Sequence, residues 1–402
     1  MSANPSLSSS NADKSISFEN TEIAFRHQAN SDLNRAYWLF RIISNGTISS
    51  LGQKLVSWGL NMALPISSMI KNTLFKHFCG GETIEECEAT IVKLAGGNVG
   101  TILDYSVEGE EQEQVFTVTA DEIIKTINRA KGDERIPFTV FKVTGISRFA
   151  LLAKINANME LTASERVEFF KLKGRVNHIC KSAYDAGVPI MIDAEESWIQ
   201  NTIDTLALEM MQLYNRERAI VYNTYQLYRK DKFTLLQADI AMAESYGFIL
   251  GAKLVRGAYM EKERERAKRL HYESPIQEAK EETDRDFNRA VTYCLNHLSS
   301  IALVAGTHNE YSCLLLADTV AELSISRNHP HVYFSQLLGM SDNLSFNLAA
   351  EGYNVCKYVP YGPVKAVMPY LFRRAEENKA IAGQTSRELS LIVKEKKRRR
   401  KA

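Results

Sequence analysis

Short apolar runs rich in β-branched residues recur along most of the chain, and a longer segment with an amphipathic, helix-like pattern follows each run. Runs of roughly four to six apolar residues are typical of parallel strands, which are buried on both faces. Eight such units are what an α/β fold of the (β/α)8 TIM-like barrel type requires, and we predict that fold. The runs are TILDYS (101–106), FTVFKVTG (138–145), PIMIDAE (189–195), AIVYNTYQ (219–226), GAKLVRG (251–257), IALVAGTHN (301–309), VYFSQLLG (332–339) and VCKYVPYG (355–362).

A doubly wound open sheet is the alternative architecture for alternating strands and helices. Such sheets usually have fewer strands, and those that bind dinucleotides carry a GxGxxG turn after the first strand. The first run here is followed by VEGEEQEQ, which lacks that turn. The barrel is therefore the favoured prediction.

The segments outside the repeat define the domain organisation. Residues 1–24 are rich in Ser and Asn and are expected to be disordered, and residues 25–84 show a helical apolar pattern that predicts an N-terminal helical arm. The barrel is expected to occupy residues 85–385. Residues 386–402 end in KEKKRRRKA, which reads as a basic C-terminal tail. Such a tail is either solvated or attracted to anionic lipid head groups, and nucleic-acid binding ranks third.

Composition narrows the classes of partner. With 49 Lys and Arg against 48 Asp and Glu, the net charge is +1, so no nucleic-acid partner is expected. The six cysteines form no CxxC pair and predict reduced thiols rather than a disulfide framework. The N-terminus lacks the apolar core of a secretory signal, and no apolar run approaches the ~20 residues of a membrane span.

Candidate chemistry follows from the barrel prediction, because active sites of such barrels lie at the carboxyl ends of the strands. This ring is rich in hydrogen-bond donors and suits an anionic substrate and a large polar cofactor. It contains one histidine, His308, and no paired metal-ligand motif, so no metal site is expected. The strand-end residues are Lys142, Thr144, Asp193, Glu195, Gln226, Lys253, Arg256, Thr307, His308, Asn309, Gln336 and Tyr358.

The segment after the eighth run, YVPYGPVKAVMPYLFRRAEENK, has an informative spacing. Tyr370, Arg373, Arg374 and Glu377 fall at i, i+3, i+4 and i+7, so a helix would project all four from one side. Two adjacent guanidinium groups could clamp a carboxylate in a bidentate manner. A solvated charged face is the equally weighted alternative.

The chain resembles the proline dehydrogenase family, in its monofunctional form and in the corresponding barrel of the bifunctional proline utilisation A proteins. Five motifs between about residues 85 and 380 carry the resemblance: FKVTG, DAEES, KLVRGAYMEKE, THN and YVPYGPVKAVMPYLFRRAEEN. The last is the most specific and KLVRGAY is nearly so, whereas THN or DAE alone would be weak. DYSVEGE and QLLGMSD are closer to the eukaryotic-type and related bacterial monofunctional enzymes.

The resemblance implies bound FAD and oxidation of L-proline to 1-pyrroline-5-carboxylate by hydride transfer, with electrons passed to a membrane quinone. It implies that Lys142, Arg373 and Arg374 bind the proline carboxylate and that Glu377 pairs with Arg374. The substrate ring would be walled by Tyr259, Tyr358, Tyr370 and a leucine of QLLG, taken as Leu338 with Leu337 as the alternative, with Asp193 near both ring and flavin. The FAD would be lined by Asp193, Ala194, Gln226, Lys253, Val255, Gly257, Ala258, Lys280, Thr307, His308, Asn309, Gln336, Arg374 and Glu377.

Two departures from the family pattern affect these expectations. Lys253 stands where many relatives have Arg, and Met260 stands where the bifunctional relatives have Trp. Lys253 is the candidate cation near the flavin, so the flavin potential is expected to be tuned differently. No residue is assigned as a general base.

Three other functions stay open. A hydroxyproline dehydrogenase would share fold and cofactor, although Tyr358 favours proline because a smaller residue is expected there to admit the hydroxyl. A flavin-free barrel enzyme could use Lys142 or Lys253 as a Schiff base. A non-enzymatic scaffold would not need the Tyr–Arg–Arg–Glu set. We expect a cytoplasmic protein, either free or peripheral on the inner membrane in a bacterium, or a protein of the mitochondrial inner membrane in a eukaryote.

Overall fold

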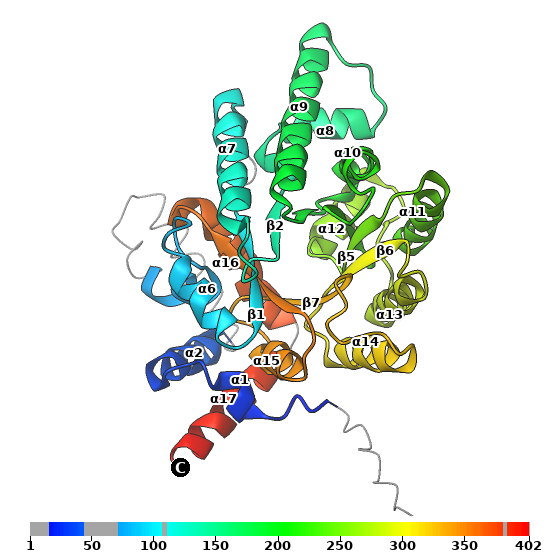
Figure 1. Ribbon diagram of the computed structural model, residues 1–402. Coiled ribbons are helices and arrows are strands. Elements are labelled where there is room, and N and C mark those ends of the chain that lie inside the picture. The colour runs from blue at the N-terminus through cyan, green and yellow to red at the C-terminus, as the bar shows by residue number, and fades with distance from the viewer. Residues whose placement is uncertain (1–15, 44–70, 107–110, 381–383, 402) are drawn as a thin grey trace, which may run out of the picture.

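The computed structural model describes residues 16–43, 71–106, 111–380 and 384–401 (Figure 1). Within these residues eight parallel strands close into a barrel in chain order, with β1 pairing with β8, which confirms the (β/α)8 prediction. Each predicted run overlaps one strand. The strands are β1 (Val99–Tyr105), β2 (Phe138–Phe141), β3 (Ile190–Ile192), β4 (Val221–Gln226), β5 (Leu250–Val255), β6 (Ile301–Gly306), β7 (Val332–Leu337) and β8 (Val355–Tyr361).

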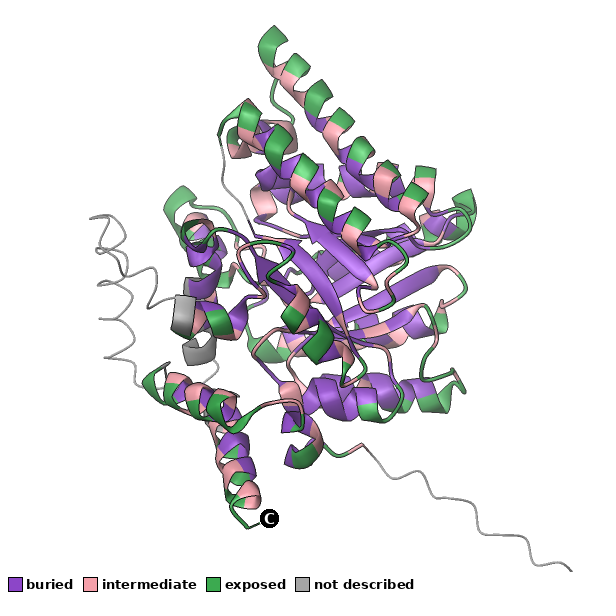
Figure 2. Ribbon diagram, turned by 60° about the vertical axis from the view of Figure 1, so that its left-hand side comes forward, coloured by how far each residue is buried: buried purple, intermediate pink, exposed green. Residues whose placement is uncertain are grey.

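Alternate residues of each strand face opposite sides of the barrel wall. One side fills the interior, where Phe138 lies edge-on to Tyr222 and Tyr333 with ring centroids 5.4 and 4.8 Å apart. The other side packs against the surrounding helices, as Leu250, Leu254 and their equivalents do. Figure 2 shows strands buried along their length and helices exposed only on their outer faces. This alternation decides which strand-end side chains can meet at the centre.

The helices around the barrel have local signals that match their sequence. Helix α9, for example, begins with a capping box between Thr162 and Glu165 and ends at Gly187 in the left-handed conformation. The surrounding helices are α6 (Glu88–Ala95), α7 (Glu113–Ala130), α8 (Phe149–Asn156), α9 (Ala163–Ala186), α10 (Ser197–Tyr214), α11 (Lys232–Tyr246), α12 (Met260–Leu270), α13 (Lys280–Asn296), α14 (Glu310–Glu322), α15 (Asp342–Ala350) and α16 (Val364–Ala380), with a 3-10 turn η2 (Val143–Gly145) after β2. All six cysteines are buried and unpaired.

The N-terminal arm packs beside the end of the barrel sequence. Its described elements are α2 (Asn30–Ile43), a π-helical turn η1 (Lys71–Phe75) and α5 (Lys76–Phe78). Helix α1 (Thr21–Phe25) precedes them and lies mostly within residues 1–24, so the expectation of disorder is wrong there, because Asn20 caps this helix and its Ala24 and Phe25 are buried. Phe75 and Phe78 share a buried cluster with Met368 and Tyr370 of α16, so the arm contributes to the core beneath that helix. Of the expected disordered segment, residues 1–15 lie outside the described residues, while Phe18 is buried.

The segment expected to be a basic tail differs from that expectation. Residues Gln384–Arg399 form helix α17, and its Leu391 and Ile392 are buried with Phe25 and Phe40 of the arm. Its basic side chains are largely engaged: Lys394 pairs with Glu19, and both Arg398 and Arg399 pair with the fully buried Glu395. The charges are adjacent in the sequence and were therefore expected to be solvated. In the structure the apolar pair Leu391 and Ile392 packs the helix against α1 and α2.

Candidate active site

Four side chains from four strand ends meet at the centre of the barrel's carboxyl end. Asp193 follows β3, and its Oδ2 accepts hydrogen bonds from Lys142 Nζ at 2.8 Å and from Tyr358 Oη at 2.7 Å. Lys253 on β5 makes an ion pair with the other carboxylate oxygen, Oδ1. Strand alternation explains the meeting, because each position continues an interior row, as Lys142 continues that of Val140. The structure therefore brings together these four residues that the sequence had singled out.

A second carboxyl group that sequence reasoning missed, Asp104 on β1, completes this cluster. It is fully buried, its Oδ1 lies 4.0 Å from Lys142 Nζ, and its Oδ2 accepts a hydrogen bond from Ser106. Its signal was present in the run TILDYS, because Asp104 is two residues beyond the interior residue Ile102. We call Asp104, Lys142, Asp193, Lys253 and Tyr358 the central cluster.

The charges of the central cluster are set by burial and by each other. Burial alone would raise the pKa of Asp193, but the Lys142 and Lys253 ammonium groups outweigh it and hold that pKa well below its ordinary value. Burial raises the pKa of Asp104; the Lys142 ammonium group opposes the rise and the Asp193 carboxylate adds to it. Burial, together with both carboxyl groups, raises the pKa of Tyr358 well above its ordinary value. Two largely buried lysines thus face the ionised Asp193 carboxylate, and the raised pKa of Asp104 makes this second carboxyl group a weaker counter-ion for Lys142, which suits the approach of an anion.

The ends of β2, β3 and β4 are tied together next to this cluster. Glu195 accepts hydrogen bonds from Thr144, at 3.1 Å from its amide and also from its hydroxyl, and burial raises the pKa of Glu195 to about 7 although those bonds lower it. Gln226 Nε2 donates to the Glu195 carbonyl at 3.0 Å. Gln226 Oε1 is buried and accepts no hydrogen bond from the described residues. Ala194 lies half-buried between the two carboxylates of this segment.

Thr307 and Gln336 connect the ends of β6 and β7 on the outer side of the barrel wall. Gln336 Nε2 donates to the Thr307 carbonyl at 3.1 Å, and Gln336 Oε1 accepts from Ser345 of α15 at 2.8 Å. Asn309 caps α14, since its Oδ1 accepts from the Ser312 amide at 3.0 Å. The structure thus gives these three residues clear structural contacts, and their expected part in cofactor binding stays a prediction.

His308 lies between the ends of β6 and β7. Its Nε2 accepts from the Leu337 amide at 3.4 Å, which leaves Nδ1 as the donor to Ser341 Oγ at 2.9 Å. Burial lowers the pKa of His308 to about 3, and the nearby cations, Lys357 and Arg374 foremost, lower it further. The imidazole is therefore neutral and has a defined orientation.

The KLVRGAY segment supplies the wall beyond β5. Arg256 makes an ion pair with Asp284 at 2.6 Å and donates to Thr307 Oγ1 at 2.7 Å. Lys280, the first residue of α13, is exposed and pairs with the same Asp284. Lys280 therefore lies outside the central cluster and is connected to Arg256, after β5, only through their shared partner Asp284 among the contacts described.

Gly257 in the same segment has φ +130°, and a Cβ atom added there would lie 2.5 Å from the Tyr228 ring. Only glycine fits this close approach of backbone to ring. The neighbours differ in exposure: Val255 is half-buried at the end of β5, while Ala258 is exposed.

Helix α16 packs against η1 and α2 of the N-terminal arm and carries the Tyr–Arg–Arg motif. Tyr370 and Arg374 are buried, and the Arg374 guanidinium lies 5.1 Å from the Tyr370 ring centroid. The half-buried Arg373 reaches the Tyr259 ring, at 6.0 Å from its centroid. These positions differ from the solvated charged face that was the alternative. The expected pairing of Glu377 with Arg374 stays a prediction, because the side chain of Glu377 is not among those described.

The two leucines of QLLG have different surroundings. Leu337 packs against the buried clusters that contain Tyr358 and Tyr370. Leu338 instead packs against the core between strands and helices. Because a substrate wall must lie with the two tyrosines, the structure favours Leu337 over Leu338, which sequence reasoning had preferred.

The family profile described as proline dehydrogenase matches residues 87–387. The chain belongs to the proline dehydrogenase family. It is 33% identical over 418 residues to "Proline dehydrogenase 1, mitochondrial" of Dictyostelium discoideum, covering 92% of this chain and 73% of that protein. It is also 30% identical to "Hydroxyproline dehydrogenase" of Xenopus laevis, covering 87% of this chain and 80% of that protein.

Among solved structures, proline utilization A from Bdellovibrio bacteriovorus inactivated by N-propargylglycine matches with a TM-score of 0.71 at 18% identity. The match covers 92% of this proline dehydrogenase family chain and 40% of that much longer chain. This likeness supports the fold.

Proposed function

We propose that this chain oxidises L-proline to 1-pyrroline-5-carboxylate with FAD as the electron acceptor. The observation that carries the proposal is the pair of largely buried lysines, Lys142 and Lys253, that meet at Asp193 in the central cluster of a chain of the proline dehydrogenase family. An amino-acid carboxylate is an anion that such a site would attract from water. The buried Arg374 and the half-buried Arg373 of α16 add two guanidinium groups.

The residues have separate parts in this proposal. Arg373, Arg374 and Lys142 bind the carboxylate and so fix the carbon next to the amine, which supplies the rate advantage of a held geometry. Tyr259, Tyr358, Tyr370 and Leu337 enclose the pyrrolidine ring and exclude water. Asp193 stays ionised and holds Lys142, Lys253 and Tyr358 in place.

FAD fits the donors and acceptors at the strand ends. Gln226 offers a buried Oε1 acceptor that the described residues leave unused, while its Nε2 is fixed by the Glu195 carbonyl. A flavin ring presents an N–H group that could occupy such an acceptor. Bound FAD would supply the acceptor for the hydride lost from proline. Lys253, Val255, Gly257, Ala258, Thr307, His308, Asn309 and Gln336 would line it, with Ala194 and Lys280 farther out.

A flavin-free Schiff-base enzyme is disfavoured by the central cluster. Lys142 and Lys253 both make ion pairs with Asp193. A Schiff-base lysine must present a free amine to the carbonyl carbon of its substrate, and both amines here are held by the Asp193 carboxylate.

Hydroxyproline is the second candidate substrate, because a relative named hydroxyproline dehydrogenase matches most of the chain. Tyr358 is buried and its hydroxyl is held by Asp193, so it leaves little room for an added hydroxyl. We expect Tyr358→Ser to raise kcat/KM for hydroxyproline relative to proline by about tenfold, equivalent to about 1.4 kcal/mol. Steady-state kinetics with both amino acids measure the ratio. An unchanged or lower ratio would remove Tyr358 from the specificity assignment.

The function is tested by adding L-proline, without oxygen, to the purified protein reconstituted with FAD. We expect the visible flavin band to bleach with L-proline and to bleach less with hydroxyproline. A flavin band that ignores both amino acids would contradict the proposed reaction. A protein that cannot be loaded with FAD would contradict the cofactor.

We also propose that the electrons pass to a membrane quinone and that the protein contacts the membrane peripherally, at the bacterial inner membrane or the mitochondrial inner membrane. No helix in the described ranges combines the length and apolar character needed to cross a bilayer. The basic C-terminal residues are a weaker argument for lipid attraction than the sequence suggested, because Lys394, Arg398 and Arg399 are paired. Deleting them would disturb the packing of α17 as well as its charge.

A further inference from the structure

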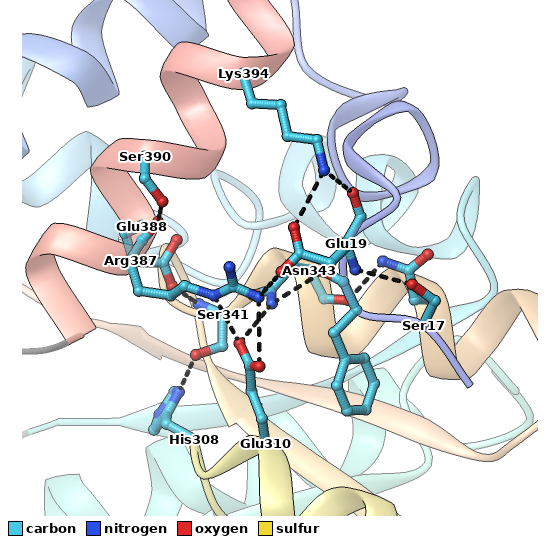
Figure 3. Close-up of polar contacts among 12 residues, drawn as sticks. Ser17, Glu19, His308, Glu310, Ser341, Asn343, Arg387, Glu388, Ser390 and Lys394 are labelled. Atoms are coloured by element: carbon cyan, nitrogen blue, oxygen red, sulfur yellow. Dashed lines mark hydrogen bonds and ion pairs between the residues drawn. The ribbon is translucent and has the colours of Figure 1, made fainter. Parts of the chain in front are cut away.

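The end of β7 and the short loop that follows it, residues 337–341, are bonded from outside the barrel by the C-terminal helix α17. We call this segment the loop 337–341. The amide of Ser341 donates to the carboxylate of Glu388 on α17 (Figure 3). The Ser341 hydroxyl meets His308 Nδ1 at 2.9 Å. Ser341 has φ +53°, an unusual conformation for serine that its surroundings must hold. Glu388, Ser341 and His308 thus form a continuous polar path from α17 to the end of β6.

The same loop is held at other points by groups that do not depend on α17. Lys357, fully buried on β8, donates to the Leu337 carbonyl at 3.3 Å and pairs with Asp342 at 2.9 Å. His77 of α5 meets the Gly339 carbonyl at 2.9 Å. The loop is therefore positioned by several elements at once, and its first residue, Leu337, packs against the clusters that contain Tyr358 and Tyr370.

We propose that Glu388 is a positioning residue of the active site, acting through Ser341 on His308 and on the loop that carries Leu337. The proposal rests on the function proposed above, because it concerns the geometry of the same substrate wall. Glu388 lies outside the barrel on α17, and its carboxylate accepts from the Ser341 amide. Its effect on proline binding is therefore expected to pass through Ser341.

Docking of α17 does not require a carboxylate at position 388. Leu391 and Ile392 bury the apolar side of the helix, and Arg387 makes ion pairs with both Glu310 and Glu19. Glu388 is 5% exposed, and burying a carboxyl group costs free energy unless hydrogen bonds or charges compensate for its lost hydration. Its contact with the Ser341 amide is one such hydrogen bond.

The charged groups facing Glu388 make its contact sensitive to pH. Asp342 of α15 repels its charge, while Lys357 of β8 attracts it; His308 beyond Ser341 is neutral, and Arg387 on its own helix is occupied by Glu310. Burial, reinforced by Asp342, raises the pKa of Glu388 to about 7. Below that pH the carboxyl is neutral and accepts weakly; above it the carboxylate accepts a charge-assisted bond from Ser341.

The sign for stability is the opposite of the sign for the contact. Because the folded pKa is raised, the stabilising contribution is complete below the ordinary value of 4.5 and is lost as the pH rises through about 7. The wild-type protein should therefore lose thermal stability relative to Glu388→Gln as the pH rises through that window, while its substrate wall tightens.

Two variants and one control test the proposal on the FAD-loaded, full-length chain. Glu388→Gln keeps an acceptor for Ser341 but does not ionise, whereas Glu388→Ala removes the acceptor. Arg387→Gln, on the adjacent residue, weakens docking of the same helix without touching Ser341. The measurements are KM and kcat for proline against pH, and hydrogen exchange of a peptide covering the loop 337–341.

We expect Glu388→Ala to raise KM about fivefold or more with a smaller change in kcat, and to speed hydrogen exchange in the loop. Wild-type KM should fall about fivefold as the pH rises from about 6 to about 8, and Glu388→Gln should reduce that step to the part that Glu195, whose pKa is also about 7, contributes. Arg387→Gln should lower the melting temperature with KM and loop exchange nearly unchanged.

Three results would overturn the proposal: unchanged loop exchange in Glu388→Ala, a pH step of undiminished size in Glu388→Gln, or an effect of Arg387→Gln on KM equal to that of Glu388→Ala. Hydrogen exchange needs no substrate turnover. It therefore still tests the positioning if proline proves not to be the substrate, and a negative exchange result leaves the proposed function standing.

Discussion

Replacing Asp193 by alanine is expected to abolish proline oxidation and to destabilise the fold by about 3–5 kcal/mol. The carboxylate holds two ammonium groups whose side chains are only 12% and 8% exposed, Lys142 and Lys253, together with the Tyr358 hydroxyl. Without it, both cations remain buried with their main counter-ion removed, and Lys142 is free to leave the carboxylate-binding position. Urea unfolding and anaerobic flavin bleaching by L-proline measure the two effects.

The matched control is Asp204→Ala. Asp204 pairs with the fully buried Lys232 between α10 and α11, outside the central cluster. We expect a similar loss of stability but retained bleaching of the flavin. Retained proline oxidation in Asp193→Ala, or its loss in a folded Asp204→Ala protein, would contradict the special part assigned to Asp193.

Replacing Arg374 by alanine is expected to raise KM for proline by about 30- to 150-fold, equivalent to about 2–3 kcal/mol, while FAD stays bound. Arg374 is buried beside Tyr370, so the charge-assisted contact with a carboxylate would be made away from bulk water. The half-buried Arg373 should show a smaller effect for the same substitution, because water can replace part of its contact.

Steady-state kinetics and flavin fluorescence after gel filtration separate substrate binding from cofactor binding. Arg148→Ala is the control, because Arg148 pairs with Glu168 at the α8–α9 side of the barrel and is expected to leave KM unchanged. An Arg374→Ala protein that releases its flavin but keeps its KM would reverse the role assigned to this residue.

The barrel could be predicted from the sequence because its signal is local and repeated. Each strand is a continuous apolar run buried on both faces, and β6 begins and β8 begins at the residues where their runs were placed, Ile301 and Val355. The polar strand ends differed more: β3 is assigned only Ile190–Ile192, although the run extended to Glu195. The Asp193 amide still donates to the Phe141 carbonyl of β2 at 3.0 Å, so the ladder continues into the polar strand end, where the apolar pattern does not record its limit.

Four of the five residues of the central cluster could be predicted from the sequence, and Asp104 was missed. Lys142 and Asp193 directly follow the apolar residues of their runs, and Lys253 and Tyr358 lie within theirs, so the barrel rule identified them. Asp104 obeys the same alternation, but it was read as part of a buried strand rather than as chemistry. For the leucine pair, alternation continued from Tyr333 through Leu337 would have favoured Leu337.

The contribution of α17 could not be read from the chain. Glu388 lies six positions before the basic run that begins at Lys394, and the charge of that run dominated the interpretation of the whole segment. Its partner Ser341 lies 47 positions away, and the partner of Lys394, Glu19, lies 375 positions away. Pairings over such separations depend on the finished barrel, and they leave no periodic pattern in the sequence.

The union of α17 with α1 and α2 has a consequence for the order in which the protein is made. Arg399 donates to the carbonyls of Phe25 and Gln28, which lie 374 and 371 positions earlier in the sequence, so two segments made far apart in time must meet. A nascent chain can lay down its strands one after another as they leave the ribosome. The arm, however, keeps Phe25 and Phe40 uncovered by Leu391 and Ile392 until α17 has been made. We therefore expect the nascent chain to expose an apolar surface to chaperones until α17 has left the ribosome.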